Sequence, residues 1–119
     1  MTTKKTNPDY LNGVPELLIL RLLAGRPMHG YDLVRAIHAE SAGKLEFGEG
    51  CVYPLLHRLE EGRFLVGDRE SVGGKTRIVY RVTRQGKKRL AESVAKWTDV
   101  VAAVRTVLEG GEHGKPAVV

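Results

Sequence analysis

The chain has 119 residues, of which 42% are hydrophobic, so it is long enough for one domain with its own core. Its single cysteine excludes an internal disulfide framework and a CxxC motif. No run approaches the ~18 apolar residues that span a bilayer, and the polar start MTTKKTNPDY lacks the apolar segment of a secretory signal. We therefore expect a soluble, cytoplasmic protein that does not associate with membranes.

The net charge of +5 is unevenly distributed along the chain. Residues 63–90 hold nine basic and two acidic residues, a local net charge of +7, which leaves −2 for the remainder. Such a concentrated basic block is typical of proteins with a polyanionic partner. A solvated face of lysines and arginines would give the same count, so charge alone leaves both interpretations open.

Two helices are expected after a flexible N-terminal arm at residues 1–12. In PELLILRLLAG, Pro15 stands at a plausible first helical position, and Gly25 ends the run. This helix is apolar on nearly all sides, which predicts burial on more than one side. The second helix is expected from HGYDL to about Ala42, with Gly43 closing it.

The segment GEGCVYPLLHRLEEG at residues 48–62 predicts a third helix with two different faces. Its core face is Val52, Leu55, Leu56 and Leu59, spaced i, i+3, i+4 and i+7. On a helical wheel the opposite side carries Gly50, Tyr53, Pro54, His57 and Glu61. Glycine and proline are poor helix formers, but here they lie outward and leave little bulk. They make sense if this end of the helix approaches another surface closely, where its free amides would favour phosphate oxygens.

After Gly62 the apolar period changes from helical to alternating. RFLVGDRE and TRIVYRV predict two strands, and SVGGK between them supplies the turn of a hairpin with a basic tip. Thr83 is then expected to cap a long helix over residues 84–109, followed by a disordered tail at 110–119. That helix carries a heptad seam formed by Leu90, Val94, Trp97, Val101, Val104 and Leu108.

Three helices, a two-stranded ribbon and a terminal heptad helix predict a fold that is mainly α with a small β-hairpin. This is a winged helix-turn-helix domain over residues 13–83, followed by a dimerisation helix at 84–109. In such a fold the third helix enters the DNA major groove and the ribbon rests on the neighbouring backbone.

The motifs also resemble a known family. HGYDLVRAI, GCVYPLLHRLEEG and RIVYRVTRQGKKRL are similar to segments of the PadR family of bacterial transcriptional regulators, and the resemblance covers residues 14–109. It implies a homodimeric winged-helix repressor, often controlled by a small molecule. Position 51, usually threonine or serine in this family, is Cys51 here, and Arg63 stands where the family has a helix-ending glycine.

Candidate DNA-binding residues follow from the helix faces and from the resemblance. Tyr53, His57 and Arg58 would supply donors to phosphates or base edges, although each could be ordinary surface or a flank of the core. Tyr31 could pack in the core or contact a phosphate, and a functional role is less expected for His29. The full predicted set is Tyr31, Gly50, Cys51, Tyr53, Pro54, His57, Arg58, Lys75, Thr76 and Arg77, the last three on the wing.

The heptad seam is expected to form the dimer interface, with Leu17 contributing from the first helix. The seam could pair with its twin or with the first helix of the other subunit. Trp97 lies in the middle of the seam, and the resemblance implies a possible role there, because some PadR-type regulators stack flat aromatic compounds between tryptophans in that region. It is therefore either an aromatic plug in the dimer core or part of an effector site with Val94 and Val101.

The sequence has no motif for catalysis or for metal binding. His29, His38, His57 and His113 show no ligand spacing, and no phosphate loop, nucleophile elbow or HExxH occurs. No cofactor is expected. The predicted function is a sequence-specific transcriptional regulator, a repressor, that binds a double-stranded operator as a homodimer. The alternatives are a winged-helix module that binds a ligand or another protein, and a DNA-packaging protein without sequence preference.

Overall fold

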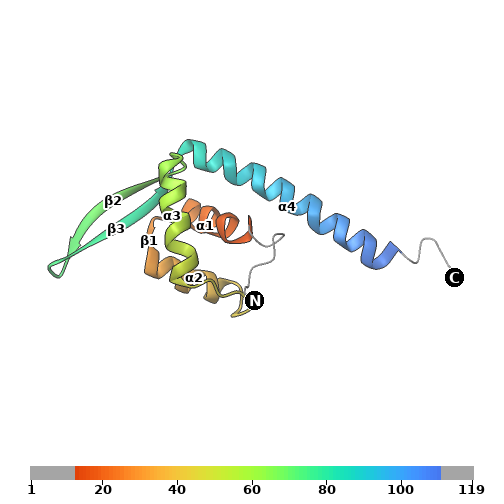
Figure 1. The fold of residues 1–119 in the computed structure, drawn as a ribbon, viewed down its shortest axis with the longest axis horizontal. Coiled ribbons are helices and arrows are strands. Elements are labelled where there is room, and N and C mark those ends of the chain that lie inside the picture. Colours follow the sequence, from red (N-terminus) through yellow and green to blue (C-terminus); the bar gives the residue numbers. More distant parts are fainter. Residues whose placement is uncertain (1–12, 111–119) are drawn as a thin grey trace, which may run out of the picture.

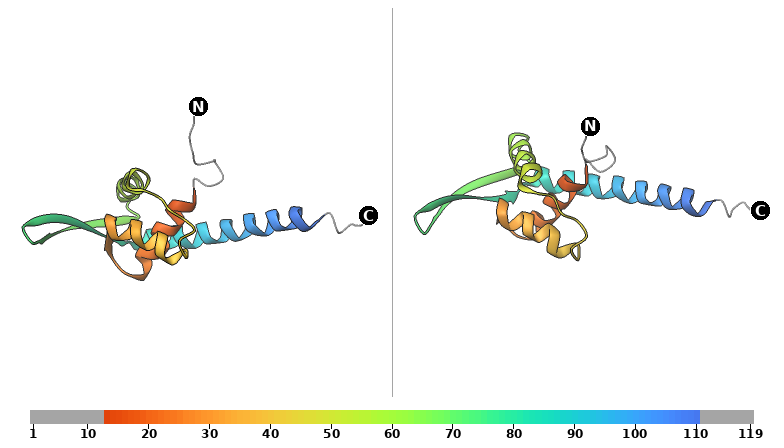
Figure 2. Two further views of the ribbon diagram at one scale, coloured as in Figure 1. Left: turned by 90° about the horizontal axis from the view of Figure 1, so that it is seen from below. Right: turned by 60° about the horizontal axis from the view of Figure 1, so that its bottom comes forward.

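The described part of the chain, residues 13–110 of a computed structural model, forms a three-helix body with two projections. Its elements are α1 (Gly13–Gly25), β1 (Met28–His29), α2 (Gly30–Glu40), α3 (Glu49–Glu61), β2 (Leu65–Val72), β3 (Lys75–Val82) and α4 (Arg84–Gly110). The β2–β3 hairpin and α4 leave the body in opposite directions (Figure 1, Figure 2). This is the predicted winged helix-turn-helix with a long C-terminal helix. The predicted arm at residues 1–12 and the tail beyond Gly110 lie outside the described residues.

One hydrophobic core lies between α1, α2, α3 and the root of the sheet. The predicted core face of α3 is confirmed, because Val52, Leu55, Leu56 and Leu59 are all buried. Helix α1 buries residues on more than one side, as its composition predicts. The other buried apolar residues are Val14, Ile19, Leu20, Leu23, Met28, Leu33, Ile37, Phe47, Leu65 and Tyr80.

The helix ends depend on backbone conformations that the sequence only partly reveals. Helix α2 ends at Glu40, two residues before its predicted end, because Ala42 and Gly43 take left-handed conformations with φ of 57° and 77°. Helix α3 starts after Gly48, which has no side chain to cap it. At its other end Arg63 has φ of 67°, the left-handed conformation in which glycine is the favoured residue.

The sheet has three strands, so the prediction of a two-stranded ribbon was incomplete. The short strand β1 joins the hairpin in the order β1-β3-β2, with Met28 opposite Tyr80. The turn of the hairpin is also tighter than predicted, because Gly73 and Gly74 both have positive φ. Two such residues suit the two-residue turns that continue the ladder on both sides. Lys75 therefore pairs with Val72 inside the strands and does not lie in a loop.

A compact contact, here called the joint (Arg63, Phe64, Thr83 and Gly86), connects the end of α3 to the start of α4. The Thr83 hydroxyl accepts a hydrogen bond from the Gly86 N–H at 3.0 Å, which confirms it as the helix cap, and donates one to the Arg63 carbonyl at 2.7 Å. Gly86 is buried, and a Cβ there would lie 2.1 Å from the Phe64 carbonyl oxygen. Both residues of the T-x-x-G motif are therefore needed for α4 to begin at this place.

A second connection holds α4 against α1. The Arg89 guanidinium donates to both carboxylate oxygens of Glu16, from Nε at 2.8 Å and from Nη2 at 3.2 Å. The same guanidinium lies 4.5 Å from the centre of the Phe64 ring. The hydrogen bond with Glu16 raises the pKa of Arg89 further above its ordinary value. Arg89 thus connects α1, α4 and the joint through one planar group.

Beyond these contacts, α4 presents apolar side chains to solvent. Leu90 packs against the core, but Trp97 is 41% exposed and Leu108 is 77% exposed. The other seam residues are Val94 and Val104, which are exposed, and Val101, which is half-buried. Val100 and Val107 broaden the exposed stripe beyond the predicted seam.

Within residues 13–110 no helix is both long and apolar enough to cross a bilayer.

Candidate nucleic-acid interface

The start of α2 and the outer side of α3 meet through a close contact between Gly30 and Tyr53. A Cβ on Gly30 would lie 2.5 Å from a ring carbon of Tyr53 and 2.9 Å from its hydroxyl oxygen. Only a residue without a side chain fits beneath this ring. The Gly-Tyr pair at residues 30–31 and the Tyr-Pro pair at 53–54 are therefore parts of one structural unit, although 22 residues separate Gly30 from the second pair.

A surface hollow of about 430 Å³ lies where α2, α3 and the wing come together. Five of the ten predicted DNA-binding residues line it: Tyr31, Tyr53, His57, Thr76 and Arg77. Tyr31 is 51% exposed, so it is not a core residue. The remaining walls are His29, Gly30, Ile78 and Tyr80. The fold therefore brings together polar groups from three separate segments of the chain.

The other predicted residues lie outside this hollow. Gly50, Pro54 and Arg58 are exposed on α3, and Lys75 is exposed beside the wing turn. Cys51 is half-buried and packs against the core. Burial raises the pKa of its thiol, an effect that the charge of Arg58 partly offsets. Cys51 is thus a neutral, sheltered thiol at the start of α3.

The glycines at the start of α3 have no internal packing role. A Cβ built on Gly48 or on Gly50 would meet no atom within 4 Å, and neither residue has a positive φ. The fold of the isolated chain therefore does not require glycine at either position. The absence of side chains there keeps the N-terminal end of α3 open from outside, as close approach to another surface demands.

The sequence suggested that Arg77 is a free cation at the wing tip, but in the structure its guanidinium has partners. Its guanidinium lies 3.0 Å from His29 Nε2 and 3.4 Å from a carboxylate oxygen of Glu70. His29 Nε2 also lies 3.0 Å from the Asp32 carboxylate, while His29 Nδ1 accepts from the Asp32 N–H at 3.4 Å. Arg77 therefore connects the wing to the first turn of α2.

His29 is central to this network, although its sequence context indicated only a minor role. Its position just before α2 was the available signal, because the residue there normally caps the helix. Nε2 has one site for a proton or a lone pair, so it cannot donate to Asp32 and accept from Arg77 at the same time. Because Nδ1 accepts from the Asp32 N–H, the ring carries its proton on Nε2, which donates to the Asp32 carboxylate and leaves the Arg77 guanidinium beside the ring without a hydrogen bond to Nε2.

Two tyrosines around the hollow remain protonated at neutral pH. Burial, followed by the charge of Glu49, raises the pKa of Tyr53. Burial also raises the pKa of Tyr80, with Glu60 adding to the effect. Both hydroxyls are therefore hydrogen-bond donors, and Tyr53 presents its donor at the surface that faces outward from α3. Such a group suits phosphate oxygens and base edges.

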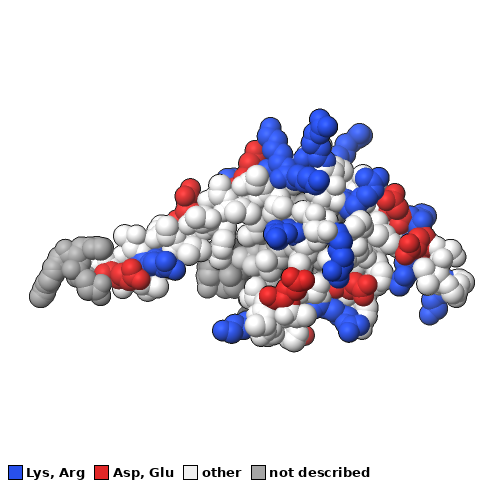
Figure 3. Space-filling model, turned by 180° about the vertical axis from the view of Figure 1, so that it is seen from behind, with Lys and Arg blue, Asp and Glu red and all other residues white. Residues whose placement is uncertain are grey.

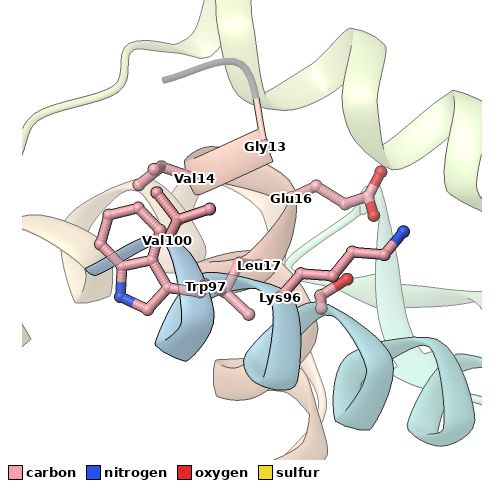
Figure 4. A pocket seen from close by; sticks show the side chains of 8 residues that line it. Gly13, Val14, Glu16, Leu17, Lys96, Trp97 and Val100 are labelled. Atoms are coloured by element: carbon pink, nitrogen blue, oxygen red, sulfur yellow. The ribbon is translucent and has the colours of Figure 1, made fainter. Parts of the chain in front are cut away.

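A second hollow, of about 270 Å³, lies between α1 and the middle of α4. Figure 4 shows the Trp97 indole beside Val14 and Val100, with the charged groups of Glu16 and Lys96 on the other side. Leu17, Gly13 and Ser93 complete the lining. The sequence left Trp97 either as an aromatic plug in a dimer core or as part of an effector site with Val94 and Val101, and those two valines do not line this hollow.

Metal-binding and catalytic groupings were not expected from the sequence. Among residues 13–110 there is no cluster of three or more histidine, cysteine, aspartate or glutamate side chains that could hold a metal ion.

Comparison with known proteins agrees with this geometry. The profile described as the transcriptional regulator PadR-like family matches residues 19–92. A transcriptional regulator of Mycobacterium tuberculosis, Rv3488, is 31% identical over 105 residues, which cover 88% of this chain and 92% of that protein. The crystal structure of a PadR family transcriptional regulator from Eggerthella lenta matches with a TM-score of 0.75 and 30% identity, over 85% of this chain and 87% of that one.

A transcriptional regulator from Clostridium thermocellum shares the fold with a TM-score of 0.78 at 22% identity, over 83% of this chain and 97% of that one. The wing and the long C-terminal helix agree with these structural likenesses, and the profile match spans residues 30–31, 53–54 and 83–86. The chain therefore belongs to the PadR-like family of transcriptional regulators.

Proposed function

We propose that this regulator is a homodimeric repressor that reads a pseudo-palindromic operator. The observation that carries the proposal is the hollow at which Tyr31, Tyr53, His57 and Thr76 converge from α2, α3 and the wing. In a winged helix-turn-helix these segments face the major groove and its flanking phosphates. Gly48 and Gly50 support the same reading, because they leave the front of α3 without side chains. The protein would act in the cytoplasm and without enzymatic activity, in keeping with a family of transcriptional regulators.

The exposed stripe on α4 supports the homodimer. Monomeric proteins rarely leave contiguous apolar patches of this kind in water, and the 3–4 spacing of Val94, Trp97, Val101, Val104 and Leu108 suits a helix–helix seam. A two-fold axis through such a seam would present two copies of α3 to one duplex. The operator half-sites would then be separated by one or two helical turns, about 10 base pairs each.

The proposal is tested by fluorescence anisotropy on duplex DNA from upstream of the protein's own gene. A scrambled duplex of the same composition serves as the sequence control, and each titration is repeated across a salt series. The His57→Ala/Arg58→Ala variant removes two exposed groups of α3, and Arg21→Ala removes an exposed arginine of α1. Tight binding that the scramble and the α3 variant lose, and Arg21→Ala keeps, supports sequence-specific reading. Equal binding of both duplexes contradicts it.

We also propose that the hollow beside Trp97 takes a flat, apolar effector. Its lining combines the indole with Val14, Leu17 and Val100, which suits an aromatic compound, and a volume of about 270 Å³ is near the lower limit for small-molecule pockets. The hollow borders the exposed stripe of α4, so a compound bound there would alter how two copies of α4 meet. Release from the operator would follow from the changed spacing of the two α3 helices.

The effector proposal is tested by titrating planar aromatic compounds while recording tryptophan fluorescence. Trp97 is the chain's only tryptophan, so quenching reports on this hollow directly. Saturable quenching, together with loss of operator binding in the wild type, supports the proposal. A Trp97→Leu variant that still releases the operator at the same compound concentration rejects the site.

A further inference from the structure

A second concentration of positive charge lies at the joint, away from the hollow of α2, α3 and the wing. Figure 3 shows several lysine and arginine side chains projecting together from the part of the surface where α4 begins. Helix α4 begins with Arg84, Lys87 and Lys88, which stand at i, i+3 and i+4 on one of its faces. Arg63 adds a fourth from the turn after α3. We call this group the ridge (Arg63, Arg84, Lys87 and Lys88), and all four residues are exposed.

The ridge cations have no acidic partner among residues 13–110, and the same holds for Arg69 and Lys75 on the wing. Arg77, Arg81 and Arg89 belong to the same basic block of sequence, yet each forms an ion pair, with Glu70, Asp68 and Glu16 respectively. None of the four ridge residues appears in an ion pair within the described part of the chain. The structure thus neutralises part of the basic block internally and leaves the ridge available to an external anion.

Two features of the ridge oppose the local stability of the fold. Arg63 has φ of 67°, where glycine would be unstrained. In addition, Arg84, Lys87 and Lys88 stand at the N-terminal end of α4, whose first turn has no acidic residue. Cations at that end oppose the helix dipole. Residues that violate local preferences at one place, without an internal partner, are characteristic of functional surfaces.

The joint holds the ridge as one rigid unit. The Arg63 carbonyl accepts from Thr83, which precedes Arg84, and the Lys87 N–H donates to the Thr83 carbonyl at 3.0 Å. The ridge therefore moves together with the C-terminal end of α3. Helix α3 has 13 residues and is about 20 Å long, so the ridge is separated by that length from the end that carries Gly50.

We propose that the ridge binds the phosphate backbone of DNA outside the half-site that α3 reads. Four exposed cations on one surface suit the phosphate backbone, which carries a dense row of negative charges and is bound without base contacts. That backbone could belong to the same duplex, beyond the half-site, or to a second duplex. The inference rests on DNA as the target of this family member, but it does not require a specific operator.

The test measures the salt dependence of binding to a 40-base-pair duplex of random sequence by fluorescence anisotropy. Lys87→Gln/Lys88→Gln removes two ridge charges and keeps good helix formers. Its matched control, Arg21→Gln/Arg26→Gln, removes two exposed charges elsewhere. Each lost phosphate contact lowers the slope of log K against log salt by about 0.9, so the ridge pair is expected to lower it by about 1.8 or more. The control pair is expected to change it by less than half as much.

Arg63→Gly provides an independent variant. Glycine relieves the left-handed strain, so we expect a higher Tm together with a slope reduced by about 0.9. An effect on DNA binding in a protein that is more stable cannot come from partial unfolding. An unchanged slope in Arg63→Gly or in Lys87→Gln/Lys88→Gln overturns the proposal, as does an equal loss in the control pair.

Energy transfer between two 20-base-pair duplexes, one with a donor and one with an acceptor, separates the two sources of backbone. Transfer that the ridge variants abolish assigns the ridge to a second duplex, whereas a reduced slope without transfer assigns it to the same duplex. Failure of the ridge and failure of the proposed operator function are distinguishable. If the ridge variants weaken binding to random DNA and no operator is preferred, the ridge proposal stands and the proposed operator function fails. If the operator is preferred and the ridge variants bind it like the wild type, the proposed function stands and the ridge proposal fails.

Discussion

The ring of Tyr53 lies directly on the backbone of Gly30, with 2.5 Å between Cε1 of the ring and the place that a Cβ of residue 30 would occupy. This contact fixes the angle at which α3 leaves the body, because the ring fills the space between the two helices. It also holds the Tyr53 hydroxyl beside Tyr31 and His57 at the hollow. The packing of one ring therefore determines how several polar groups are presented.

Gly30→Ala is expected to destabilise the protein by about 1–3 kcal/mol, the usual effect of overpacking. The added methyl must displace the Tyr53 ring, so DNA affinity should fall as well. Urea unfolding followed by circular dichroism measures the first effect, and anisotropy measures the second. In the double variant Gly30→Ala/Tyr53→Ala the two changes should be clearly non-additive. Strict additivity would show that the ring and the glycine do not interact.

Gly50→Ala should increase stability and decrease DNA affinity, whereas Gly30→Ala should decrease both. An added Cβ meets no atom within 4 Å, and alanine is the better helix former, so the free energy of unfolding should rise by up to about 1 kcal/mol. The methyl group projects from the outward face of α3, so DNA affinity should decrease. Thermal unfolding and anisotropy on the same preparations test both. A more stable variant with unchanged DNA affinity would remove Gly50 from the interface.

The Arg89–Glu16 pair should contribute measurably although it is partly exposed. The guanidinium makes two hydrogen bonds to one carboxylate and stacks on Phe64, a better geometry than that of most surface pairs. A double-mutant cycle with Glu16→Gln and Arg89→Gln should give a coupling energy of about 1 kcal/mol in urea unfolding. The coupling should weaken in 1 M NaCl. A value near zero at low salt would mean that this ion pair does not help to hold α4 against α1.

Cys51 should react slowly with alkylating agents. Burial raises the pKa of its thiol, so at pH 8 a smaller fraction is thiolate, and only the thiolate is nucleophilic. The rate with iodoacetamide should be below that of glutathione and should rise towards it in 6 M guanidinium chloride. The pH at which the rate increases should also be higher in the folded than in the unfolded protein. Mass spectrometry of quenched samples follows the reaction, and a rate above that of glutathione would contradict the assignment.

Val104→Glu is expected to produce a monomer. The residue lies in the exposed apolar stripe of α4 and is 51% exposed in the single chain, so a glutamate there need not disturb the core. In a helix–helix seam two such charges would face each other without water. Sedimentation velocity should give a dimer for the wild type and a monomer for the variant. The matched change Ala103→Glu, also exposed on α4 but outside the predicted seam, should leave the dimer intact.

The periodic parts of the fold were predictable from the sequence because burial follows spacing. The core face of α3 is a clear example. The cap at Thr83 was predictable for a different reason, because threonine is a favoured residue just before a helix. The short strand β1 was missed, since Met28 and His29 carry no pattern of their own and are strand only because β3 lies beside them. The end of α2 was predicted two residues late, because nothing in the sequence marks Ala42 as left-handed.

The sequence predicted which residues belong to the candidate site better than it predicted which residues they contact. Tyr53 and His57 could be assigned to the outer face of α3 from a helical wheel. Arg77 could not be assigned to His29 and Glu70, because those contacts depend on the register of the wing and on a residue 48 positions away. The roles of Gly30 and Gly86 depend likewise on distant atoms, the Tyr53 ring and the Phe64 carbonyl.

The joint makes α4 a lever arm for α3. Helix α4 has 27 residues, which gives it a length of about 40 Å. Thr83 and Gly86 fasten its first turn to the end of α3, and Arg89 and Leu90 hold the following turn against α1 and the core. Over such a length, a tilt of about 5° displaces the far end by about 3.5 Å. A small displacement imposed near Leu108 is thus reduced to a fine angular adjustment of α3. Coarse movements along the arm would therefore become graded changes in the tilt of α3.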